Sequence, residues 1–165
     1  MKALPKLTGL IVTLMASMIV ITPPAVAQDW ANEWQVGDMH VSQVRAGAAD
    51  GGVAAYFLIH NHGAATGVLV SVVAVDGGAA QLRTTSAEAD VTQVVEHMEI
   101  AAESTLVLEP GGNHVLISGL TAAPTAGDQL RLALQFDVGP AITITLPVLT
   151  ADEASGTTSG TGHGH

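Results

Sequence analysis

The chain has 165 residues, of which 48% are apolar, and it contains no cysteine. The only lysines are Lys2 and Lys6, and all 15 acidic residues lie from Gln28 onward. That part of the chain has three arginines as its only other charged residues, so its net charge is −12 with neutral histidines. This charge repels phosphate backbones and argues against nucleic acid as a partner. Because there is no thiolate, blue-copper sites, iron–sulfur clusters and CxxC redox motifs are excluded.

Residues 1–27 have the pattern of a cleaved signal peptide. Lys2 and Lys6 form a basic start, residues 7–22 are mostly apolar, and Ala25-Val26-Ala27 has the Ala-x-Ala spacing that signal peptidase recognises. The apolar run is shorter than the roughly 20 residues of a membrane-spanning helix. We therefore expect a Sec-type signal peptide, an exported, periplasmic protein and no membrane span after cleavage.

Residues 28–150 are predicted to form one all-β domain. Runs rich in β-branched residues alternate between apolar and polar positions, as in residues 130–136, and pairs such as Gly77-Gly78 provide turns between them. We expect about nine strands in a Greek-key β-sandwich, at residues 39–44, 53–60, 68–75, 80–85, 91–98, 105–108, 114–118, 130–137 and 141–148. Residues 87–90 could form one helical turn, and the Gly-, Ser- and Thr-rich residues 151–165 are expected to be a flexible tail.

Histidine is the residue type that suggests a chemical function. The chain has no nucleophile elbow, P-loop, dinucleotide fingerprint or zinc-protease motif, so we expect no enzyme. His60 and His62 have the spacing at which two imidazoles on one strand face bind one ion, but they enter a turn, where we expect the alternation to fail and the rings to lie near solvent. The methionines that follow the signal peptide each adjoin a histidine, in Met39-His40 and His97-Met98.

The run Pro110-Gly111-Gly112-Asn113-His114 resembles the PCu(A)C family of periplasmic copper chaperones, which carries Pro-Gly-Gly-x-His-x-Met-Leu at this place. Residues 53–63, residues 127–136 and Pro147-Val148 are also similar to that family, so the resemblance covers residues 36–149. It implies a cupredoxin-like β-sandwich that binds Cu(I) through two histidines and two methionines. It also implies delivery of copper to a membrane copper oxidase, through an oxidase subunit or an assembly factor.

Residue by residue, the resemblance retains only part of that ligand set. His114 matches the second histidine of the family, whereas Leu116 stands where the family has methionine. The first histidine falls on Gln81 or Arg83, depending on the placement of gaps, and the permanent charge of an inward Arg83 would repel a cation. His97 and Met98 lie a few residues beyond the position of the other methionine and are candidate replacements.

The end of the tail is a separate candidate site. His163 and His165, with the terminal carboxylate, can surround Cu(II) or Zn(II), although a tail without a function is an equal alternative. Three hypotheses follow: a copper-binding or copper-delivering protein with ligands at His114, His97, Met98, His163 and His165; a protein-interaction module that retains the fold but has lost the copper site; and a metal buffer that uses exposed histidines.

Overall fold

The computed structural model describes residues 33–86 and 91–156, and it is all-β, which confirms the predicted fold class. The predicted helical turn at 87–90 and the candidate ligands His163 and His165 lie outside the described residues. The elements in chain order are β1 (Trp34–Val36), β2 (Met39–Ala49), β3 (Gly52–Asn61), β4 (Gly67–Ala74), β5 (Ala79–Ser86), β6 (Val91–Val95), β7 (Met98–Ile100), β8 (Thr105–Leu108), β9 (His114–Ser118), β10 (Gln129–Phe136), β11 (Ile142–Leu149) and α1 (Ala151–Ala154).

The predicted strand at residues 91–98 is in fact two strands. β6 pairs with β5, whereas β7 pairs with β4, and only Glu96 and His97 separate them. The chain therefore leaves one layer of the fold at this point and joins the other. β1 is an additional strand, paired with β2, and β2 continues five residues beyond its predicted end to Ala49.

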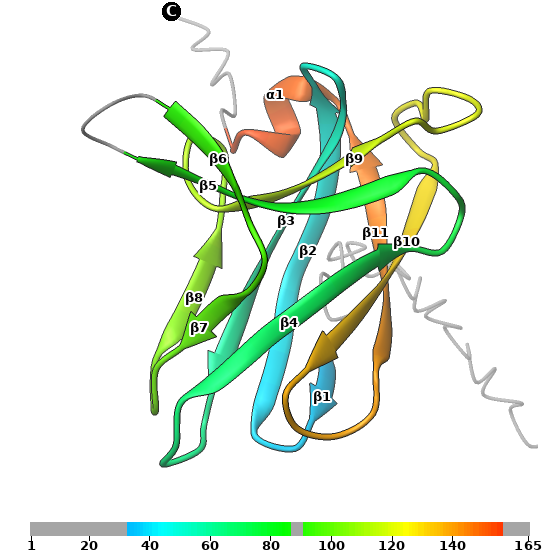
Figure 1. Ribbon diagram of the computed structural model, residues 1–165. Helices are drawn as coiled ribbons and strands as arrows, with labels where there is room; N and C mark the ends of the chain where they lie inside the picture. The colour runs from blue at the N-terminus through cyan, green and yellow to red at the C-terminus, as the bar shows by residue number, and fades with distance from the viewer. Residues whose placement is uncertain (1–32, 87–90, 157–165) are drawn as a thin grey trace, which may run out of the picture.

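The strands follow one hydrogen-bonded path in the order β6-β5-β9-β3-β2-β11-β10-β4-β7, with β1 beside β2 and β8 beside β3. Neighbours are antiparallel except β11 and β2, which are parallel. Because β6 and β7 lie at opposite ends of this path and are adjacent in the chain, the sheet folds back on itself into two layers. Figure 1 shows β4 lying across β3 and β2, with β10 beside β11. In the described residues no helix is long and apolar enough to cross a membrane.

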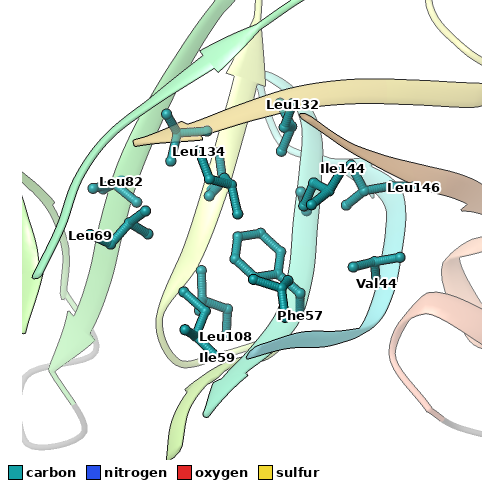
Figure 2. Close-up of a cluster of buried hydrophobic side chains, with 14 of the residues drawn as sticks. Val44, Phe57, Ile59, Leu69, Leu82, Leu108, Leu132, Leu134, Ile144 and Leu146 are labelled. Carbon is teal, nitrogen blue, oxygen red and sulfur yellow. The ribbon is translucent and has the colours of Figure 1, made fainter. Parts of the chain in front are cut away.

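The space between the layers is filled by the apolar face of each alternating strand. Phe57 lies at the centre of the close-up in Figure 2, surrounded by side chains from both layers such as Leu108, Leu134 and Ile144, all of them 0% exposed. Each such side chain contributes about 1.5–3 kcal/mol when it is removed from water. Met39 and Met98 also belong to this core, so both thioethers of the described chain serve packing.

Residues 151–154, at the start of the predicted flexible tail, form the short helix α1. Thr150 and Glu153 form a capping box at its N-terminus, each side chain accepting from the other's backbone nitrogen. Arg45 Nε donates to the carbonyl oxygen of Ala154 at 2.9 Å. Ala154 packs so closely that a Cβ added at Gly47 would lie 2.4 Å from its methyl carbon. Gly47 is therefore the position on β2 that admits α1 to the outer side of the sheet.

Candidate metal-binding sites

The alternation of β3 and β9 places the candidate ligands on the outer face of the sheet. On β3, Phe57 and Ile59 face the core, and on β9 Val115 and Ile117 do so. The residues that alternate with these core residues, including His60 and His114, therefore point away from the core. The histidines on these strands are half-buried, which leaves part of each ring open to solvent.

His114 begins β9, and its ring is held in one orientation. Nδ1 lies 3.0 Å from the carbonyl oxygen of Gly112. Because a carbonyl oxygen can only accept a hydrogen bond, Nδ1 is the donor, and in the neutral imidazole Nε2 is then the nitrogen with the free lone pair. Histidines that bind metals are commonly fixed in this way, with the second ring nitrogen donating to a carbonyl group. His114 is therefore prepared to bind a metal through Nε2.

The neighbours of His114 differ from the ligands that the family resemblance implies. Arg83 lies directly opposite His114 on β5, and Gln81 lies opposite Leu116. Opposed residues of an antiparallel pair project to the same side, so all four share the outer face. The Arg83 guanidinium donates to Gln81 Oε1 at 3.2 Å, while its Nε is shielded from water and has no partner. A permanent cation thus stands beside the single imidazole, and this disfavours tight binding of a metal ion.

The structure does not bring His97 and Met98 to His114. Met98 is 7% exposed in the core and pairs with Leu69 on β4, so its sulfur is unavailable at the outer face. His97 is exposed and lines a shallow hollow with residues of β4, including Val68. Since Val94 lies opposite Arg83, the chain has already moved away from His114 by the time it reaches His97.

The structure gathers three other histidines at the far end of the β2–β3 ladder. His40 and His60 are directly opposed across the two strands. The His60 and His62 rings meet edge to face with centroids 4.2 Å apart, and the His40 and His62 centroids are 5.9 Å apart. Glu33 Oε2 lies 3.3 Å from His40 Nε2. We refer to His40, His60, His62 and Glu33 as the histidine cluster.

The expected loss of alternation at His62 is wrong, because the ladder continues one residue past β3. His62 N donates to the carbonyl oxygen of Asp38 at 2.9 Å. Asn61, between the two histidines, is 0% exposed and points inward. Its side-chain amide donates to the carbonyl oxygens of Ala65 and Ile100 at 2.8 and 3.0 Å. The buried Asn61 side chain therefore fixes the backbone that turns His60 and His62 outward together.

Within residues 33–86 and 91–156, no three His, Cys, Asp or Glu side chains are arranged to hold a metal ion in the conformations seen. The outer face thus carries His114 beside a cation, and a separate cluster of imidazoles whose nitrogens do not yet converge.

The described residues thus form a two-layered all-β domain with histidines on the outer face of one layer. The chain belongs to the family described as "Putative lipoprotein LpqE-like", whose model matches residues 35–148. The chain is 31% identical over 118 residues to a protein of Leifsonia xyli subsp. xyli described as "Putative lipoprotein Lxx21020". This match covers 69% of this chain and 71% of that protein.

Two solved structures show the same fold at low sequence identity. The copper-bound PCuAC domain from PmoF2 is 20% identical with a TM-score of 0.61, and the match covers 72% of this chain and 97% of that domain. The CuI-DR1885 solution structure from Deinococcus radiodurans is 22% identical with a TM-score of 0.56, covering 76% of this chain and 86% of that one. At these identities the likeness establishes the architecture of the domain.

Proposed function

We propose that the chain is an exported copper-binding protein of the periplasm that holds Cu(I) through His114 on an open sheet face. The observation that carries the proposal is the ring of His114, whose Nδ1 is held by the Gly112 carbonyl oxygen so that Nε2 is free. The copper-bound state of a domain with this fold supports the choice of metal. The signal-peptide pattern of residues 1–27 and the lipoprotein descriptions of the family and its relative support export.

The proposed role is exchange of copper rather than storage. A single imidazole in a fixed orientation, with a guanidinium beside it, binds copper weakly and releases it readily. Such a site suits transfer of copper to a partner such as a copper oxidase or its assembly factor. His163 and His165 at the end of the chain are proposed as additional ligands, with Cu(II) as the ion they take. His97 and Met98 are omitted from the proposed site, because one lies away from His114 and the other is buried.

A competition titration of the mature chain with Cu(I), under reducing conditions and against a chromophoric chelator of low Cu(I) affinity that a weak site can outcompete, tests the proposal. His114→Ala should abolish one-to-one binding, whereas the matched control His97→Ala, which removes an exposed imidazole elsewhere, should leave it intact. Unchanged binding in His114→Ala would show that the assignment is wrong. Deletion of residues 155–165 should remove Cu(II) binding to the tail and spare Cu(I).

A second candidate function is a protein-interaction module that has retained the fold and lost the copper site. Arg83 and Leu116 favour it, because they replace two expected ligands with a cation and an apolar side chain on the same face. If the mature chain takes no Cu(I) from the chelator under reducing conditions, even with excess metal, this candidate is favoured over copper binding.

A further inference from the structure

We propose that the histidine cluster is a second metal site, which binds a divalent ion of the Zn(II) or Cu(II) type through His40, His60, His62 and Glu33. This site is separate from His114, and the proposal does not depend on copper binding there.

Two of the three pairs of imidazole rings lie near the spacing that one ion requires. With metal–nitrogen bonds of about 2.0–2.1 Å and tetrahedral angles, two imidazoles on one zinc ion have ring centres about 5 Å apart. The observed centroid separations are 4.2 Å for His60 and His62 and 5.9 Å for His40 and His62, one on each side of that value. Small rotations of the rings, without movement of the strands, can therefore turn their nitrogens toward a common point.

The side chains around the cluster support coordination. The His60 Nδ1 and the Thr105 hydroxyl are 2.6 Å apart, which fixes the ring plane and leaves Nε2 outside that hydrogen bond. His62 is exposed, so its ring can leave the edge-to-face contact at little cost. The carboxylate of Glu33, already 3.3 Å from the His40 ring, can supply an oxygen as the fourth ligand.

The types of ligand select the ion. Imidazole and carboxylate suit Zn(II) and Cu(II), whereas Cu(I) favours sulfur ligands, which the cluster lacks because Met39 next to His40 is only 2% exposed in the core. The excess of acidic residues in the mature chain raises the local concentration of divalent cations over monovalent ones.

The test is calorimetric titration of the full-length secreted chain with Zn(II). A His163→Ala/His165→Ala background removes the tail as a competing ligand without shortening the chain. In that background we expect one equivalent of Zn(II) to bind, and His60→Ala/His62→Ala should weaken this binding by more than about 100-fold, since even changes in outer-shell groups cost 10–100-fold. His97→Ala serves as the matched control and should bind as the background does.

Single His62→Ala is the variant least able to disturb the fold, because its side chain is exposed, and it too should weaken Zn(II) binding. Equal Zn(II) affinity in His62→Ala and in the background, or no Zn(II) binding in the background itself, would overturn the proposal. Cu(I) titration of the same variants separates it from the proposed function: His114→Ala should lose Cu(I) and keep Zn(II), and His60→Ala/His62→Ala should do the reverse.

Discussion

Replacing Asn61 with alanine should be one of the most costly polar substitutions in the domain. The Asn61 amide nitrogen donates to the carbonyl oxygens of Ala65 and Ile100, and the Asn61 carbonyl oxygen accepts from Gly63 N at 2.9 Å. Each buried hydrogen bond contributes about 0.5–1.5 kcal/mol net, and an acceptor left unpaired in the interior costs about 1–3 kcal/mol. Three bonds, one of which leaves the buried carbonyl oxygen of Ile100 without this partner, give an expected loss of about 2–5 kcal/mol in the free energy of unfolding.

Urea unfolding followed by tryptophan fluorescence measures this loss, with Asn113→Ala as the matched control. Asn113 is half-buried, and its side chain accepts from Thr84 Oγ1 at 2.8 Å, so its replacement should cost less than about 1 kcal/mol, as expected for a partly solvated hydrogen bond. Because Asn61 fixes the backbone of the histidine cluster, Asn61→Ala should also weaken Zn(II) binding at temperatures where the variant is still folded. A loss below about 1 kcal/mol would refute the view that Asn61 anchors this end of β3.

Three further outcomes are expected. Arg83→His/Leu116→Met should raise the affinity for Cu(I) at least about tenfold over the parent, because it replaces the cation and adds a soft thioether ligand on the face of His114. The chelator competition measures this affinity. If the double variant gained no affinity over Arg83→Gln alone, that result would contradict the placement of these positions on one face. Phe57→Ala should lower the free energy of unfolding by about 3–5 kcal/mol, since the ring fills the centre of the core, and a shift in the urea midpoint equivalent to less than about 1 kcal/mol would be inconsistent with that position. Hydrogen bonds and charge from Arg131 lower the pKa of Asp76 below its ordinary value of 3.8. The stability that this pair adds is therefore complete above pH 3.8 and is lost as the pH falls through the lower pKa of the folded state. Asp76→Asn should be less stable than the parent at pH 7, and a difference in stability that persists unchanged at pH 2 would contradict the assignment.

The alternation of apolar residues was sufficient to predict most strands of this domain. Residues 130–136 and 142–146 alternate because one face meets the core, and β10 and β11 follow that pattern closely. The break between β6 and β7 could not be predicted in the same way, since Met98 continues the apolar pattern and only the pairing with β4 takes the chain into the other layer. The helix α1 could have been found, because Thr150 and Glu153 have the spacing of a capping box.

The histidine cluster was beyond prediction for a specific geometric reason. Counting back from the β2–β3 turn, where Ala49 lies opposite Gly52, would place His40 opposite Asn61. A bulge between Ser42 and Arg45, where Gln43 has a φ of 52°, shifts the register by one residue. His40 therefore meets His60 on the same face, and no local sequence pattern gives the position of such a bulge.

The single strand β3 also sets how independently two bound ions would behave. Ala55 lies opposite Val115, so Tyr56 is level with His114, and His60 lies four residues further along. At about 3.3 Å per residue the backbone positions of the two sites are roughly 13 Å apart along the strand. That separation is too large for a shared ligand and exceeds the screening length of about 8 Å at physiological ionic strength. Occupancy of one position should therefore leave the affinity of the other unchanged, and a doubly loaded chain would show two additive binding steps without cooperativity.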